Sequence, residues 1–193
     1  MTSTDEKPIK RQMPLPGAGS EKARMAAMVR VDHAGEFGAV RIYEGQLAVL
    51  RGRPGMEDTV AEIEHMAAQE DEHLETFDRL AIERGVRPTA LAPVWHVAGF
   101  ALGAATALMG PKAAMACTAA VETEIDNHYA AQLAELDDKD PELKDFVAKF
   151  REDEIEHRDK ALANGAEDAI AYPLLSRAIR LGCRAAIRIS EKI

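Results

Sequence analysis

The chain has 193 residues, a formal net charge of −9 and 30% charged residues. This length suits one domain with a substantial core, and the acidity excludes a general nucleic-acid surface, because phosphates repel negative charge. Hydrophobic residues make up 47% but aromatic residues only 5%, which favours helices. Cys117 and Cys183 belong to no motif, so neither a disulfide framework nor a thiolate metal site is expected.

Residues 1–19 are polar and contain three prolines, so we expect a disordered tail before a single domain over residues 20–193. Hydrophobic periodicity predicts two long helices joined by a Gly-Arg-Pro-Gly turn, a crossover, and a second pair joined by a turn that ends at Pro141. The predicted helices cover residues 21–51, 56–84, 94–109, 112–136 and 141–163, and a last one follows the loop with Tyr172 and Pro173. Short connections between long helices predict antiparallel neighbours in a four-helix bundle.

The motif Glu-x-x-His occurs at corresponding places in the two predicted pairs. Residues three apart share one face of a helix, so each motif directs a carboxylate and an imidazole the same way. A further glutamate lies on the preceding helix of each pair, and two such sets are the ligands of a dimetal carboxylate site in a bundle. The predicted ligands are Glu36, Glu70, His73, Glu122, Glu154 and His157.

A third copy of the motif, Glu62 with His65, tests this prediction. Measured from the turn near residues 53 and 54, Glu36 and Glu70 lie at equal distance, about 17 residues each way, whereas Glu62 sits roughly 13 Å away along the helix axis. Glu122 and Glu154 are likewise level about the second turn. The third motif is therefore expected to be a solvated face.

Four carboxylates and two imidazoles suit iron or manganese, since no sulfur is present to select zinc or copper(I). In such sites Glu70 and Glu154 would bridge the metals, and Glu36 and Glu122 would each serve one metal. Two ferrous ions can deliver the electrons for O₂ cleavage while the protein positions the substrate.

The segments around these residues closely resemble the demethoxyubiquinone hydroxylases of ubiquinone biosynthesis, from about residue 24 to the C-terminus. The likeness lies in RVDHAGEFGA (30–39), QEDEH (69–73), VRPT (86–89), GFALGA (99–104), AMACT (114–118), VE (121–122), FREDE (150–154), EH (156–157) and GCRAAI (182–187).

The resemblance implies an all-α, ferritin-like four-helix bundle with a crossover helix and a C-terminal amphipathic helix. It also implies a di-iron monooxygenase that hydroxylates the ring of a polyprenylated demethoxyubiquinone, with O₂ as co-substrate and NADH as reductant. No nucleotide-binding fingerprint is present, so the place where NADH acts stays open. A lipid-binding accessory protein of the pathway is a further implied partner, and a homo-oligomer stays open.

His128 and Tyr129 follow Glu122 by a little under two turns, where the family has a His-Tyr pair. The resemblance implies substrate gating or proton delivery. The alternative is structural, with Tyr129 in the core and His128 donating a hydrogen bond to a neighbour of the site. Asp71 and Asp153 are further candidates for that supporting role.

Gly35 and Gly38 flank Glu36 within a helix, where each glycine costs up to about 1 kcal/mol relative to alanine. Either close helix packing or room for a quinone ring would explain them, and the sequence does not choose.

Two segments are candidates for contact with a membrane, where a polyprenyl quinone resides. The uncharged helix 94–109 is too short to span a bilayer and has Trp95 at its start, as an interfacial aromatic would be. The last helix is amphipathic, with a basic stripe suited to anionic lipid. Its arginines are Arg177, Arg180, Arg184 and Arg188. Bundle packing or a dimer contact is the alternative for both. With no signal or transit segment recognised, we expect a peripheral enzyme on the cytoplasmic face of the bacterial inner membrane, or alternatively on the matrix face of the mitochondrial inner membrane.

Two other classes of function stay open. Another ferritin-like dimetal protein, a peroxidase or an iron store, would share the ligands, although two isolated cysteines cannot build a rubredoxin-type site. A non-catalytic, membrane-bound quinone- or lipid-binding scaffold with a structural metal is the second.

Overall fold

A computed structural model describes residues 20–137 and 139–193, so the predicted tail over residues 1–19 lies outside the described part. Within these ranges the chain forms six α-helices and one 3-10 turn, η1, and no strand. The elements are α1 (Glu21–Leu50), α2 (Glu57–Arg84), α3 (Ala92–Leu108), α4 (Pro111–Leu136), α5 (Pro141–Ala163), η1 (Ala166–Asp168) and α6 (Tyr172–Ser190).

The ends of the helices follow from local sequence. The Ser20 hydroxyl accepts a hydrogen bond from the Ala23 N–H at the start of α1, and Gly85 ends α2 in the left-handed region, with φ of +64°. Asp140 caps α5, and Pro141 occupies its first turn. Tyr172 and Pro173, expected in a loop, instead begin α6, because proline is favoured in the first turn of a helix.

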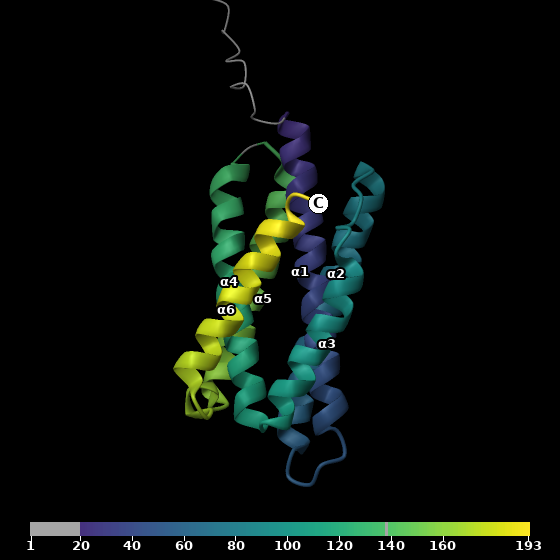
Figure 1. Cartoon of the computed structure of the whole chain (residues 1–193). Helices are drawn as coiled ribbons and strands as arrows, with labels where there is room; N and C mark the ends of the chain where they lie inside the picture. Colours follow the sequence, from purple (N-terminus) through teal and green to yellow (C-terminus); the bar gives the residue numbers. More distant parts are fainter. Residues whose placement is uncertain (1–19, 138) are drawn as a thin grey trace, which may run out of the picture.

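Helices α1, α2, α4 and α5 form the bundle, α3 lies along α1, and α6 lies along α4 (Figure 1). The predicted all-α, ferritin-like bundle is therefore confirmed. Glycines allow α3 to lie close to α1: a Cβ on Gly103 would overlap the Ile42 carbonyl oxygen, and one on Gly45 would overlap that of Phe100. The crossover helix is thus held against the bundle by backbone proximity that only glycine permits.

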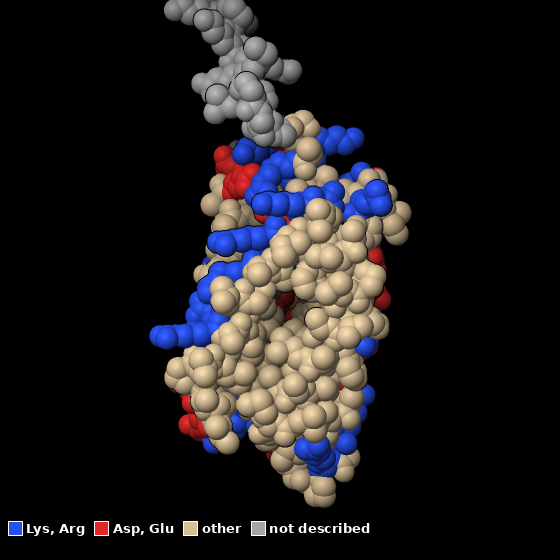
Figure 2. Space-filling model, viewed as in Figure 1, with Lys and Arg blue, Asp and Glu red and all other residues tan. Residues whose placement is uncertain are grey.

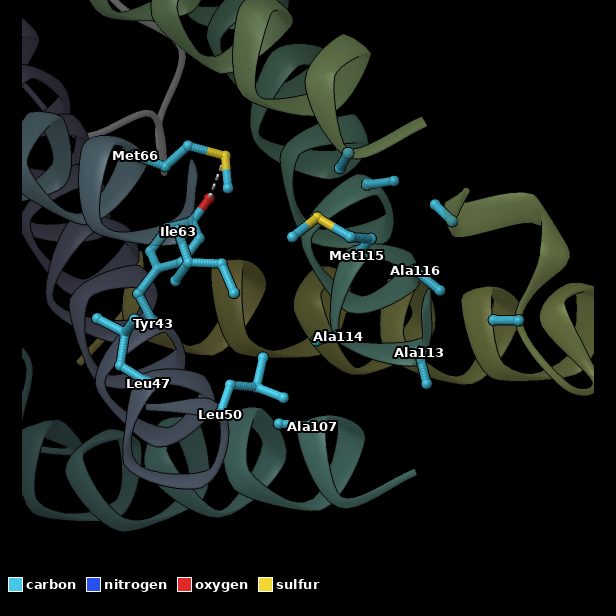
Figure 3. Close-up of a cluster of buried hydrophobic side chains, with 14 residues drawn as sticks. Tyr43, Leu47, Leu50, Ile63, Met66, Ala107, Ala113, Ala114, Met115 and Ala116 are labelled. Atoms are coloured by element: carbon cyan, nitrogen blue, oxygen red, sulfur yellow. Dashed lines mark hydrogen bonds between the residues drawn. The ribbon is translucent and has the colours of Figure 1, made fainter. Parts of the chain in front are cut away.

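Three apolar clusters are buried, and two of them lie toward opposite ends of the bundle, while the third joins α1, α4 and α6. The first surrounds Tyr43, Leu47 and Met66 near the α1–α2 turn (Figure 3), and the second includes Phe77 and Phe150 toward the other end. On each of the four bundle helices the predicted metal ligands fall between residues of these clusters along the sequence. The site is therefore a polar layer enclosed by apolar core on both sides.

Two of the four arginines of the predicted basic stripe on α6 form ion pairs with the bundle. Arg180 and Arg184 both pair with Glu124, a buried carboxylate on α4, and so fasten α6 to the bundle. The sequence could not show this, because the acid and the two arginines are far apart along the chain. Arg177 and Arg188 remain exposed. Over the described ranges, no helix combines the length and apolar character needed to cross a bilayer.

Candidate dimetal site

The structure brings the six predicted ligand side chains together in the centre of the bundle. They form two overlapping groups whose ligand atoms lie within 4.8 Å of one another. One group adds Glu36 and His73 to Glu70 and Glu154, and the other adds Glu122 and His157 to the same two glutamates. Glu62 and His65 lie outside both groups, in agreement with the register argument.

Glu70 and Glu154 are shared evenly between the two histidines. Glu70 places Oε1 3.2 Å from Nδ1 of His157 and Oε2 3.8 Å from Nδ1 of His73. Glu154 places Oε1 3.3 Å from Nδ1 of His73 and Oε2 3.5 Å from Nδ1 of His157. Each carboxylate therefore presents one oxygen to each side, as a bridging ligand must.

All six side chains are at most 3% exposed. Both oxygens of Glu70 and Glu154 and the Nδ1 atoms of both histidines have no hydrogen-bond partner. Buried polar atoms are nearly always paired, so this concentration of unpaired donor atoms fits two divalent cations. The anionic oxygens and imidazole nitrogens are also the donor types that iron and manganese accept.

Electrostatics in the layer follow from burial and crowding. Burial, together with the neighbouring carboxylates, raises the pKa of Glu70 and Glu122 well above the usual range. Burial alone would lower the pKa of His73, but its contacts with Glu154 and Glu36 raise it to about 11. The enclosed carboxylates therefore need protons or metal cations to balance their charge.

Two buried tyrosines hold the outer glutamates, and each reaches across to the other half of the bundle. Tyr129 on α4 donates a hydrogen bond to Glu36 on α1, while Tyr43 on α1 donates to Glu122 on α4 at 2.9 Å. Sequence reasoning singled out Tyr129 but missed Tyr43. The signal was present, because each tyrosine lies seven residues, about two helical turns, after a ligand glutamate.

Each candidate histidine contacts a residue of the other Glu-x-x-His helix, the one directly before the glutamate of that motif. Nε2 of His73 lies 3.1 Å from Oδ2 of Asp153, and Nε2 of His157 lies 3.1 Å from Oε1 of Gln69. The contact with His73 thus supports the supporting role suggested for Asp153. Asp71 is exposed and has no such contact, and Gln69 was missed.

His128 lies just outside the ligand layer. Its Nε2 is 3.1 Å from Oδ1 of Asp32, and Gln132 donates a hydrogen bond to the same oxygen at 2.7 Å. Burial raises the pKa of Asp32, despite these contacts. His128 therefore touches a buried acid outside the six candidate ligands, whereas Tyr129 touches Glu36, one of those candidates.

A cavity of about 470 Å³ opens beside the layer, between α1, α3, α4 and α6. Figure 2 shows it as a hollow in a broad uncharged surface, with acidic side-chain atoms visible at its bottom. Gly35 and Gly38 line it, and a Cβ on Gly38 would meet nothing within 4 Å. Gly38 therefore leaves open space near Glu36. A Cβ on Gly35 would contact Ile125 at 3.7 Å, and the close helix packing involves Gly45, Gly99 and Gly103.

The fold and this layer define a ferritin-like bundle with a candidate dimetal carboxylate centre and an apolar cavity beside it. Comparison with known proteins narrows the class. The family model described as ubiquinone biosynthesis protein COQ7 matches residues 23–190, and the chain belongs to this family.

Curated relatives agree with this assignment. The chain is 54% identical over 179 residues to a 3-demethoxyubiquinol 3-hydroxylase of Rhodospirillum rubrum, covering 93% of this chain and 83% of the relative. It is 51% identical over 175 residues to the mouse mitochondrial NADPH-dependent 3-demethoxyubiquinone 3-hydroxylase, covering 89% and 79%. It is 40% identical over 190 residues to the yeast mitochondrial 5-demethoxyubiquinone hydroxylase, covering 90% and 80%.

Proposed function

We propose that this protein is a di-iron monooxygenase that hydroxylates the ring of a polyprenylated demethoxyubiquinone in ubiquinone biosynthesis. The observation that carries the proposal is the apolar cavity with carboxylates at its bottom. A quinone ring needs access to the metal layer, and its polyprenyl tail needs an apolar surface along which it can extend out of the cavity. The names of the relatives support the same reaction.

The residues have distinct parts in this proposal. Val31, Ile42 and Leu102 supply part of the apolar wall that would exclude water from the ring. Gly38 leaves room for the ring near Glu36. Tyr129 donates a hydrogen bond to Glu36, so it is assigned the part of holding or moving a proton at that glutamate.

Two iron ions would be held by Glu36 and His73 on one side and by Glu122 and His157 on the other, with Glu70 and Glu154 between them. When bound, they supply the electrons that activate O₂. Tyr43 and Tyr129 keep one oxygen of each outer glutamate engaged and so orient these ligands.

The reductant is a reduced nicotinamide. The resemblance implied NADH, whereas the mouse and human relatives are named as NADPH-dependent. Both deliver the same hydride, so the choice rests on recognition of the ribose phosphate and is decided by comparing the two.

The test loads the protein with Fe²⁺ without oxygen, adds a demethoxyquinone and either NADH or NADPH, admits O₂, and measures product mass. A gain of one oxygen atom supports the proposal. Glu70→Gln is expected to abolish the gain, and Glu62→Gln, the same change in the motif outside the layer, is the matched control. Iron oxidation with no change in the quinone would favour an iron store or peroxidase, and metal binding with neither reaction would favour the scaffold.

We further propose that the uncharged face seats the enzyme on a membrane surface, from which the quinone enters. Val97 and Leu108 on α3 and Leu181 on α6 are each about two-thirds exposed. Exposed arginines on α6 lie along one side of this face (Figure 2) and would contact anionic headgroups. The proposed location is the cytoplasmic face of a bacterial inner membrane, or the matrix face of the mitochondrial one.

Flotation with anionic vesicles tests this placement. Replacing Val97 and Leu181 with aspartate is expected to leave the protein unbound. Ile82→Asp changes a still more exposed residue on α2, a helix that does not line the cavity, and should float like the wild type. Wild-type protein that stays wholly in solution contradicts the placement.

A further inference from the structure

The two halves of the candidate metal layer have matching polar contacts, except at one position. In each half, the residue before the Glu-x-x-His glutamate reaches across to the histidine of the other half. That residue is Asp153 on α5, facing His73, and Gln69 on α2, facing His157, both at 3.1 Å. One histidine therefore has a carboxylate partner and the other has a neutral amide.

The remaining donors are matched between the halves. Each metal position has one outer glutamate, one histidine Nδ1 and the same two shared glutamates. Each outer glutamate accepts a hydrogen bond from a buried tyrosine seven residues after the opposite one. The polar contacts of the two positions thus differ chiefly in the partner of the histidine Nε2.

The difference has a direct chemical consequence. When Nδ1 of a histidine binds a metal, its Nε2 carries the hydrogen and donates it outward. A carboxylate acceptor makes that hydrogen bond charge-assisted and gives the ring more negative character, so the ring is a stronger ligand than one donating to an amide.

We propose that the two metal positions are unequal, and that Asp153 is the positioning residue that makes the His73 position bind its divalent cation more tightly than the His157 position. The inference rests on the proposed dimetal centre and deepens it. It predicts that ions enter in order, first beside His73 and then beside His157.

Titration of the metal-free protein with Co²⁺, followed by visible absorption and calorimetry, tests the proposal. The wild type is expected to bind two ions in two resolved steps. Asp153→Asn keeps the shape and gives His73 the kind of amide partner that His157 has, so the tighter step should weaken by about 10- to 100-fold. Asp71→Asn is the matched control, because it removes the same charge at an exposed residue next to Glu70, and it should leave both steps unchanged.

A second variant tests the proposal independently if Asp153→Asn folds poorly. Gln69→Glu places a carboxylate beside His157 and should tighten the weaker step, and the double variant should reverse the order of filling. Two ions bound with equal affinity in the wild type, or an Asp153→Asn titration matching that of Asp71→Asn, would overturn the inference while leaving the dimetal centre in place. A wild type that binds no Co²⁺, Fe²⁺ or Mn²⁺ would overturn the centre itself, and the inference with it.

Discussion

Removing the metals should reverse the dependence of stability on pH. In the metal-free fold, burial and neighbouring carboxylates raise the pKa of Glu70 and Glu122, so the folded state binds protons more tightly than the unfolded chain. Their contribution to stability is complete below the ordinary glutamate pKa and is lost as pH rises toward the raised values. His73, with its pKa raised to about 11, acts in the same direction above its usual value of 6.5, whereas Glu154, lowered to about 2, stays ionised throughout.

The size of the effect follows from linkage. Each carboxyl whose pKa in the fold lies above the working range costs about 1.4 kcal/mol of unfolding free energy per pH unit, or up to about 2.7 kcal/mol between about pH 5.5 and 7.5. Bound cations replace these protons, so metal binding releases protons and stabilises the fold more strongly as pH rises. The metal-free and metal-loaded proteins should therefore diverge toward neutral pH.

Urea denaturation followed by far-ultraviolet circular dichroism, at both pH values, with a chelator or with Mn²⁺, measures this divergence. Glu70→Gln combined with Glu122→Gln removes the two titrating carboxyls and should make the slope of the metal-free protein shallower, leaving the part that His73 contributes above about pH 6.5. A metal-free protein that gains stability over this range, or a double variant whose slope equals that of the wild type, would refute the reasoning.

Three further outcomes are expected. Gly103→Ala should lower the free energy of unfolding by about 1–3 kcal/mol, because the added Cβ would overlap the α1 backbone. Gly38→Ala should instead raise it by up to about 1 kcal/mol, because its Cβ would meet nothing. Thermal unfolding compares the two variants, and equal effects would contradict the packing argument. Tyr43→Phe should weaken metal binding at the Glu122 position about 10-fold or more with the fold intact, as calorimetry would show, and unchanged affinity would exclude an orienting role. Glu124→Gln should speed amide hydrogen exchange in α6 but not in α5, since it weakens the ion pairs that fasten α6; exchange rates equal to those of the wild type would contradict that.

The ligand layer was predictable because it depends on position along helices. Register about a turn placed Glu36 level with Glu70 and excluded Glu62, and helical periodicity put each histidine beside its glutamate. Contacts between non-adjacent helices were not predictable in this way, since they depend on how each helix is rotated about its axis. Gln69 was missed for that reason, whereas the spacing of Tyr43 after Glu36 was a usable signal.

Charge patterns and glycines show the same limit. Four arginines spaced along α6 indicated one exposed stripe, but a single buried acid on α4, Glu124, binds two of them. Glycine in a helix indicated either close packing or open space, and only the neighbouring backbone distinguishes Gly103 from Gly38.

The crossing pattern of supports has an evolutionary consequence. In each half, the tyrosine and the residue that contacts a histidine both act on candidate ligands of the other half. One half alone would therefore lack the hydrogen-bond partners of its own ligands. It could gain them only by pairing with a second copy of itself. In such a symmetric pair every substitution appears twice, so Asp153 opposite Gln69 could not arise. Because both halves lie in one chain, they can carry different residues at this position, as Asp153 and Gln69 do.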